Sequence, residues 1–281
     1  MTLNVYIGTE ENQYLPQRVL EYSIKKQAKQ PVNVRAIRMD LTKRKGGTNF
    51  GFVRFYVPQL NNYEGRAIYV DADQLVCADI NELANELNDN NCSVALVNNP
   101  EGNFGDKQGA EIRHNQTSVM VLDCARLKDW NPETMFDHVV PNREELKPGQ
   151  IHYRDFMTLS WYDQSKIQPI DPRWNHYNIN RPDTKLTHFS YVREQPWRSP
   201  FLNYKAYFDK AMKNKGKGKG SALGQAMKRI ASEPKKAEHR LTQFWGDWLR
   251  MAVKDGYISR WEVIREVLKG DIHPKFLKCL V

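Results

Sequence analysis

Segments with the period of a β-strand alternate with segments of helical period along the first half of this chain, and this alternation limits the folds that it can adopt. Residues 13–27 show helical periodicity, and Asp79 is suited to cap a further helix. Strand candidates are short runs in which apolar residues alternate or dominate, at residues 3–7, 32–37, 66–70, 93–97 and 118–122. Because strands and helices alternate, we expect an α/β layer structure with a largely parallel sheet.

Two polar segments directly follow strand candidates: Gly8-Thr9-Glu10 and Asp71-Ala72-Asp73. In sheets of this kind, ligands bind beyond the carboxyl ends of the strands, where both segments would lie. Residues two apart project from the same side of an extended chain, so both carboxylates can converge on one Mg²⁺ or Mn²⁺ ion, which would neutralise a diphosphate leaving group. A solvated turn or a helix cap is the alternative interpretation of an isolated Asp-x-Asp segment.

The formal net charge of +9 is concentrated in the last third of the chain. Between residues 198 and 281 there are 19 Lys and Arg residues against 8 Asp and Glu. We therefore divide the chain into residues 1–200 and a basic region at 201–281. In this region we expect helices at residues 203–212 and 222–231 around a Lys/Gly run at 213–220, followed by two stronger amphipathic helices.

Two interpretations of this basic region remain open. Its Lys and Arg residues could attract an anionic membrane surface while Trp245, Trp248 and Trp261 enter the interface. Alternatively, these aromatic side chains form ordinary packing between helices. Nucleic-acid binding is a weaker option because a Lys/Gly run provides only non-specific attraction to phosphate.

An ordered set of motifs surrounds the Asp-Ala-Asp segment. Arg54-Phe55-Tyr56-Val57-Pro58-Gln59-Leu60 precedes it, and Asp79-Ile80-Asn81-Glu82-Leu83 follows it. Further motifs are Ile7-Gly8-Thr9-Glu10, residues 19–24 and 117–122, Trp174-Asn175, His188 and Gln195-Pro196-Trp197. In this order they closely resemble the motifs of family 8 glycosyltransferases, over roughly residues 3–200.

The resemblance implies a GT-A fold, which is a Rossmann-like mixed sheet flanked by helices, here with a helical basic C-terminal extension. It also implies a retaining transfer of a hexose from a UDP-sugar donor with Mn²⁺ (or Mg²⁺) as the metal. The implied metal ligands are Asp71, Asp73 and His188, of which the imidazole suits Mn²⁺ better than Mg²⁺. The implied donor-binding residues are Gly8, Thr9, Glu10, Arg54, Asp71, Ala72, Asp73 and Gln195.

The chain departs from the family pattern at several positions. Gln195 stands where the family usually has lysine, so we expect Arg193 or Arg198 to supply a cation for the diphosphate instead. The usual Asn-Ser-Gly is replaced by residues 116–118, and the usual Asp-Gln pair by Asp155-Phe156. Our catalytic candidates are Gln116 and Asp155, with Asp155 as the carboxylate near the reacting sugar carbon. A plain helix-start role is the alternative for Asp155.

The expected acceptor is a glycan or a lipid-linked glycan of a bacterial or viral surface. A nucleotidyltransferase on a similar fold is a second possibility, but it would need basic residues in a glycine-rich loop after the first strand, where this chain has Gly8-Thr9-Glu10-Glu11. A third is a non-catalytic basic protein that binds membranes or nucleic acid, against which the intact Asp71, Asp73 and His188 argue.

The sequence also favours a cytoplasmic protein, peripheral on the membrane if it binds lipid. No basic head with an apolar stretch opens the chain, and no run approaches the roughly 18 apolar residues of a membrane-spanning helix. The four cysteines are scattered without a Cys-x-x-Cys pair, which favours free thiols over disulfides or a zinc site.

Overall fold

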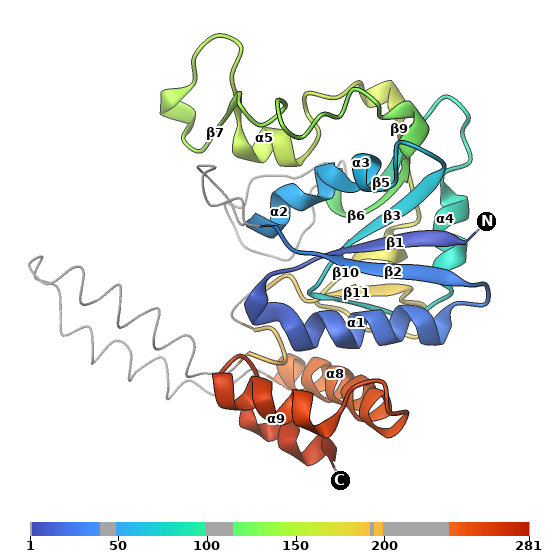
Figure 1. Cartoon of the computed structure of the whole chain (residues 1–281), viewed down its shortest axis with the longest axis vertical. Helices are drawn as coiled ribbons and strands as arrows, with labels where there is room; N and C mark the ends of the chain where they lie inside the picture. The colour runs from blue at the N-terminus through green and yellow to red at the C-terminus, as the bar shows by residue number, and fades with distance from the viewer. Residues whose placement is uncertain (1, 40–48, 99–114, 192–193, 199–235, 281) are drawn as a thin grey trace, which may run out of the picture.

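A six-stranded sheet forms the centre of the computed structural model, which describes residues 2–39, 49–98, 115–191, 194–198 and 236–280 (Figure 1). Its strand order is β2-β1-β3-β6-β5-β9. The strands are β1 (Leu3–Gly8), β2 (Val32–Ile37), β3 (Arg66–Asp71), β5 (Val94–Asn98), β6 (Asn115–Asp123) and β9 (Ile167–Pro169). The sheet is mixed rather than largely parallel, because β6 runs antiparallel to both of its neighbours, β3 and β5.

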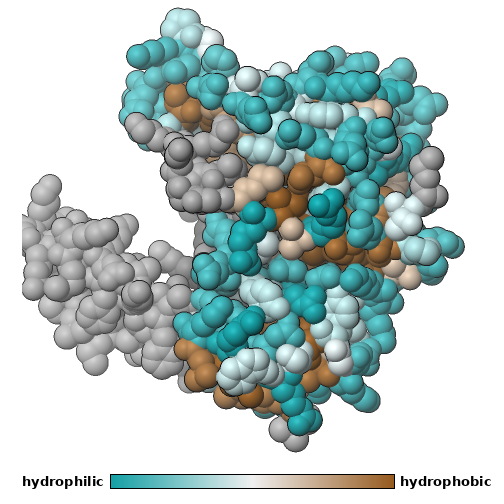
Figure 2. All heavy atoms as spheres, in the orientation of Figure 1, coloured by the Kyte–Doolittle hydropathy of each residue, from teal (hydrophilic) through white to brown (hydrophobic). Residues whose placement is uncertain are grey.

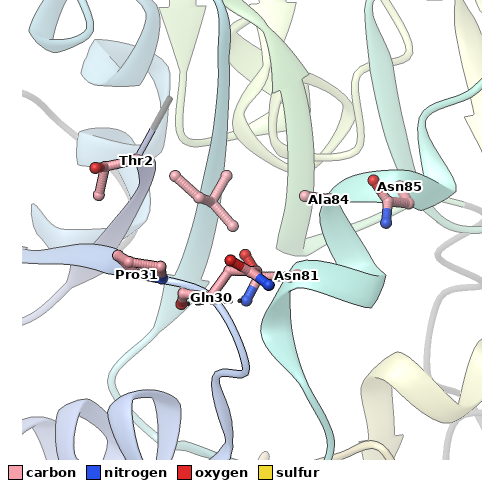
Figure 3. A pocket seen from close by; sticks show the side chains of 7 residues that line it. Thr2, Gln30, Pro31, Asn81, Ala84 and Asn85 are labelled. Carbon is pink, nitrogen blue, oxygen red and sulfur yellow. Dashed lines mark hydrogen bonds between the residues drawn. The ribbon is translucent and has the colours of Figure 1, made fainter.

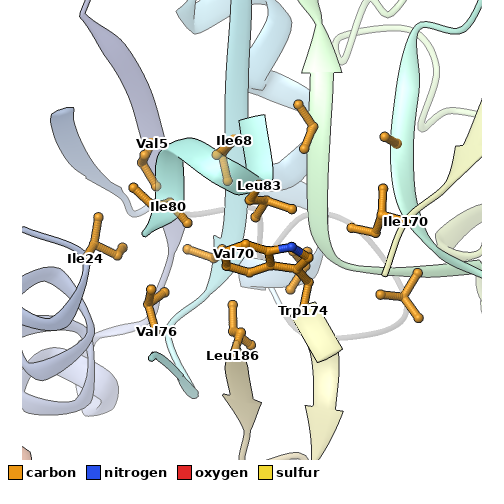
Figure 4. Close-up of a cluster of buried hydrophobic side chains, with 14 of the residues drawn as sticks. Val5, Ile24, Ile68, Val70, Val76, Ile80, Leu83, Ile170, Trp174 and Leu186 are labelled. Atoms are coloured by element: carbon orange, nitrogen blue, oxygen red, sulfur yellow. The ribbon is translucent and has the colours of Figure 1, made fainter. Parts of the chain in front are cut away.

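Alternate residues of β1, β3, β5 and β6 enter cores on opposite faces of the sheet, as the two-residue period of a strand requires. One core packs β1 and β3 against α1 (Tyr14–Gln27) and α4 (Ile80–Glu86), with Trp174 at its centre (Figure 4). The other core packs the sheet against α2 (Asn49–Val53), the 3₁₀ turn η2 (Arg54–Tyr56) and α3 (Val57–Leu60). As expected, Asp79 caps α4, because its side chain accepts a hydrogen bond from the Asn81 amide at 3.1 Å.

A small three-stranded sheet lies beside the main one. It has the order β10-β11-β4 and consists of β10 (His176–Tyr177), β11 (Leu186–His188) and β4 (Gln74–Val76). A two-stranded sheet of β7 (Val139–Val140) and β8 (Ile151–His152) precedes α5 (Tyr153–Met157). Short 3₁₀ turns join these elements, at η1 (Glu11–Gln13), η3 (Cys124–Arg126), η4 (Arg143–Glu145), η5 (Gln164–Lys166) and η6 (Pro172–Asn175).

The C-terminal helices pack against the outer side of α1 (Figure 1). They are α8 (Lys236–Lys254) and α9 (Arg260–Lys269), followed by the 3₁₀ segment η7 (Pro274–Leu280). Trp245 is fully buried and Trp248 is 8% exposed, because both lie in a hydrophobic cluster with residues of α1. Of the two interpretations of the basic region, packing between helices therefore holds for Trp245 and Trp248, whereas Trp261 is 63% exposed.

Three other expectations from the sequence concern residues 203–231, the cysteines and membrane-spanning helices. The helices expected at residues 203–212 and 222–231, and the Lys/Gly run between them, lie outside the described residues. Cys77, Cys92, Cys124 and Cys279 are free, as expected. Among the helices that the structure describes, none is long and apolar enough to span a membrane.

Candidate metal and donor site

Two sheets bring the Asp-Ala-Asp segment and His188 together. Asp71 is the last residue of β3, and Asp73 lies between β3 and β4. Strand β4 pairs antiparallel with β11, so that Gln74 lies opposite His188. The backbone amide of Phe189 donates a hydrogen bond to the Asp73 carbonyl at 2.9 Å, which holds the two segments together.

Asp71, Asp73 and His188 form a compact buried cluster. Each of the three is 6% exposed, and one potential ligand atom from each lies within 4.8 Å of the others. The two oxygens of Asp73 differ, because Oδ2 accepts a hydrogen bond from Gln195 Nε2 at 2.9 Å while Oδ1 is buried without a hydrogen-bond partner. Asp73 Oδ1 lies 3.4 Å from His188 Nε2.

A hydrogen-bond network orients the His188 ring. Asn175, at the end of η6, donates through Nδ2 to Gln116 Oε1 at 2.7 Å and to Ser118 Oγ at 3.0 Å. Its Oδ1 therefore faces the His188 Nδ1 atom, 3.0 Å away, as an acceptor. The Ser118 hydroxyl oxygen lies 3.3 Å from the same Nδ1 atom. In the neutral ring with its proton on Nδ1, the Nε2 lone pair would face Asp73 Oδ1.

Arg54 holds Asp71 from the opposite side. Its Nη2 lies 3.1 and 3.3 Å from the two Asp71 oxygens, its Nη1 donates to Thr117 Oγ1, and its guanidinium lies 5.2 Å from the centre of the Tyr69 ring. The Tyr69 hydroxyl donates to Asp71 Oδ1 at 2.6 Å. Burial raises the pKa of Asp71, against the opposing effect of Arg54, and burial raises the pKa of Tyr69 well above its ordinary value.

The residues present fit a divalent cation. The formal charges of the two carboxylates are only partly balanced by Arg54, and burying an unbalanced charge is costly. A bound cation would give the unpaired Asp73 Oδ1 a partner and could be ligated by Nε2 of a neutral His188. Two carboxylates and one neutral imidazole form an oxygen-rich donor set that suits Mn²⁺.

The Gly8-Thr9-Glu10 segment lies beside the cluster because β1 and β3 are parallel neighbours with Gly8 opposite Asp71. A side chain at Gly8 would collide with the Tyr69 hydroxyl, so the close approach requires glycine. The Ala72 amide donates to the Gly8 carbonyl at 2.9 Å. Thr9 is buried and Glu10 is half-buried. The contacts of these residues to uridine stay predictions, as does contact of Arg54 with the donor.

Gln195 and Arg198 also reach the cluster. The Gln195 amide bonds to Asp73, as described above, and the Arg198 Nε–H donates to Gln195 Oε1 at 2.8 Å. Arg198 is half-buried, and burial lowers its pKa. The other expected cation, Arg193, lies outside the described residues.

The two catalytic candidates have different surroundings. Gln116 is buried and belongs to the network that orients His188. Asp155 lies in the first turn of α5, where its two oxygens accept hydrogen bonds from Arg143 at 2.9 and 3.0 Å. Helix α5 is tied to β6 because Thr117 Oγ1 donates to the Met157 carbonyl at 2.6 Å. The catalytic roles of both residues stay predictions.

The sequence patterns do not identify Tyr69, Ser118 or Asn175 as site residues. The contact between Tyr69 and Asp71 could have been found, because residues two apart share one side of a strand. Asn175 belongs to the Trp174-Asn175 motif, but its bond to His188 depends on the packing of η6 against β6 and β11. No local signal in the sequence gives that packing.

One surface hollow lies away from this site. It has a volume of about 500 Å³ and lies beside Leu3, at the opposite end of β1 from Gly8 (Figure 3). Its lining contains no ionisable side chain and consists of Thr2, Leu3, Gln30, Pro31, Asn81, Ala84 and Asn85. It offers no group for acid–base or metal chemistry.

The fold is the GT-A fold of solved glycosyltransferases. The structure is similar to that of WbbM, a bifunctional glycosyltransferase in its apo form, with a TM-score of 0.52 and 15% identity over 70% of this chain and 47% of that chain. It is also similar to the apo glycosyltransferase GlyE of Streptococcus pneumoniae TIGR4, with a TM-score of 0.52 and 12% identity over 84% of this chain and 66% of that chain. The chain thus spans about half the length of the WbbM chain.

The sequence pattern of glycosyl transferase family 8 matches residues 1–199, and this chain belongs to that family. It is also 25% identical to Protein CDI of Arabidopsis thaliana over 214 residues, which cover 69% of this chain and 78% of that protein. The expected family and GT-A fold are thus confirmed.

Proposed function

We propose that this protein transfers a hexose from a UDP-sugar to a glycan or glycolipid acceptor with retention of configuration, and that it depends on Mn²⁺. The observation that carries the proposal is the buried cluster of Asp71, Asp73 and His188, in which Asp73 Oδ1 has no hydrogen-bond partner and lies 3.4 Å from His188 Nε2. Family membership supports a sugar transfer over a nucleotidyl transfer.

The residues of the chain have distinct roles in this proposal. Asp71, Asp73 and His188 hold the metal, Arg54 and Tyr69 fix Asp71, and Gly8, Thr9 and Glu10 border the uridine. When bound, the divalent cation supplies positive charge that stabilises the departing diphosphate. The donor phosphates then lie at the carboxyl ends of β1 and β3, which is the usual ligand side of such a sheet.

The acceptor step needs a group that takes a proton. Asp155 is the proposed carboxylate near the sugar carbon, but its oxygens are engaged by Arg143, which weakens it as a base. We therefore assign deprotonation of the acceptor to the departing phosphate, which carries the charge released by bond cleavage. Gln116 contributes by orienting Asn175 and thus His188.

A screen of donors tests the proposal without a known acceptor. The full chain is incubated with UDP-, GDP- and CMP-sugars, with Mn²⁺ or with a chelator, and release of the nucleotide is measured. We expect slow hydrolysis of a UDP-hexose that requires the metal, and its loss in Asp73→Ala. Release that is unaffected by the chelator, or a preference for GDP- or CMP-sugars, would contradict the proposal.

We further propose that an anionic membrane surface binds the C-terminal helices and so brings the site to a lipid-linked acceptor. On α9, Trp261 is 63% exposed and Leu268 is 75% exposed; they are two helical turns apart and so share one face. Hydrophobic atoms gather over α9 and the end of the chain in the lower part of Figure 2. The exposed Arg260 and Lys269, at the ends of α9, add positive charge that suits anionic headgroups.

A further inference from the structure

Gln195 connects a proposed metal ligand to a cationic side chain. Its Nε2 donates to Asp73 Oδ2 at 2.9 Å and to the Phe189 carbonyl at 3.0 Å. Its Oε1 accepts from Arg198 Nε at 2.8 Å, and its backbone carbonyl accepts from the Arg198 amide at 3.1 Å. A single amide group therefore fixes the position of the Arg198 guanidinium relative to Asp73.

Arg198 has negative neighbours but no ion-pair partner among the described residues. Asp73, Glu10 and Asp271 act on it electrostatically, yet no described carboxylate pairs with it. Its Nε is used by Gln195, while Nη1 and Nη2 bond to none of the side chains and carbonyls that the structure describes. These two nitrogens form the fork that a guanidinium uses to bind a phosphate group.

The turn that carries Arg198 packs against the C-terminal helices through Trp197. Trp197 is 1% exposed, and its ring lies between those of Phe189 and Trp245, with centroid distances of 5.4 and 5.2 Å. The His273 amide donates to the Trp197 carbonyl at 2.8 Å. The backbone at Arg198 therefore belongs to a packed turn, and the Nε bond to Gln195 restrains the side chain, which reduces the entropy lost when it binds a ligand.

We propose that Arg198 binds the diphosphate of the donor, and that Gln195 is the positioning residue that orients its guanidinium. The inference rests on the proposed donor site. Of the two arginines expected from the sequence to supply this cation, it selects Arg198 and adds Gln195 as the residue that orients it. Because the Gln195 amide also holds Asp73, the orientation of Arg198 and that of the metal ligand are linked.

The test measures binding of UDP and of uridine to the full chain at saturating Mn²⁺, by calorimetry for UDP and by NMR titration for uridine. We expect Arg198→Ala to weaken UDP binding about 10- to 100-fold, the range of a lost charge-assisted hydrogen bond. Uridine binding should not change, because uridine has no phosphate. Arg250→Ala is the matched control, since it removes an exposed arginine on α8.

Two further variants test the role of Gln195. Gln195→Met should weaken UDP binding in the wild-type background, and at saturating Mn²⁺ it should add less to Arg198→Ala than it costs alone, because the bond between Gln195 and Arg198 is then already lost. Gln195→Lys should restore UDP binding to Arg198→Ala, by placing a cation beside Asp73. Such rescue would not occur if Arg198 only supported the fold.

Several results would overturn the inference. Unchanged UDP affinity in Arg198→Ala would exclude the phosphate contact, and an equal loss for UDP and uridine would indicate a structural role. If the wild-type chain binds UDP with Mn²⁺ and Arg198→Ala binds it with the same affinity, this inference fails but the proposed function does not. If the wild-type chain does not bind UDP at all, the proposed function fails with it.

Discussion

At the scale of single residues, the orientation of the His188 ring depends on Asn175. Metal-binding histidines commonly donate their other ring N–H to a fixed acceptor, which sets the tautomer and the direction of the free lone pair. Here that acceptor is Asn175 Oδ1, and its orientation is set in turn by bonds from Nδ2 to Gln116 and Ser118. The ring is therefore oriented toward Asp73 before a metal binds.

Asn175→Ala should lower the affinity for Mn²⁺ about 10- to 100-fold, as is typical when a partner of a metal ligand is lost. Free Mn²⁺ can be followed by electron paramagnetic resonance during titration of the full chain. Asn33→Ala is the matched control, because Asn33 is exposed on β2 and bonds to Asn4. Wild-type affinity in a folded Asn175→Ala variant would show that His188 does not depend on this bond.

Local spacing was sufficient to predict part of the site. The two carboxylates follow a strand at i and i+2, and this spacing alone gave their convergence. The order of motifs gave His188. The partners of Arg54 and Asp155 could not be predicted in this way, because the Asp71 and Arg143 contacts join segments whose relative position depends on tertiary packing.

At the scale of elements, the longer helices and strands were predictable, whereas the short helices α2, α3 and α5 and the strand that carries His188 were not. β11 has only three residues and β10 only two, too few to show a period. The direction of β6 also escaped prediction, because alternation of side chains is the same in parallel and antiparallel strands. Asp79 could be recognised because a cap acts within its own helix.

Variants of helix α9 test the proposed membrane binding. Removal of residues 201–281 would expose Trp197, which packs on Trp245, so point variants of the full chain are preferable. The double variant Trp261→Ser, Leu268→Ser should reduce flotation with phosphatidylglycerol vesicles at least about 10-fold, because two exposed apolar side chains no longer enter the interface. Flotation with phosphatidylcholine vesicles should be weak.

Leu146→Ser is the matched control for flotation, since Leu146 is 40% exposed and lies outside the C-terminal helices. Raised salt should weaken flotation of the wild-type chain, because the headgroup attraction is electrostatic. If the wild-type chain stays in solution with anionic vesicles, or if the double variant floats equally well, α9 is not a membrane-binding surface.

At the scale of the whole molecule, the C-terminal helices pack against residues next to the proposed donor site. They share one hydrophobic cluster with α1, Phe189 and Trp197, and polar contacts reinforce it, including Tyr22 to Asp255 at 2.6 Å. Trp197 packs on Trp245 of α8 and directly precedes Arg198. Helix α8 therefore contacts the turn that carries this arginine. The division of the chain at residue 200 stays a prediction, since the two parts share this core.

The central claim is that Asp71, Asp73 and His188 hold a divalent cation. A crystal structure of the full chain with Mn²⁺ and UDP, with diffraction recorded at the manganese absorption edge, tests it most directly. We predict an anomalous peak between Asp73 Oδ1, His188 Nε2 and the Asp71 carboxylate, in contact with the diphosphate of UDP. Bound UDP with no anomalous peak at these residues, or with the peak elsewhere, would contradict it.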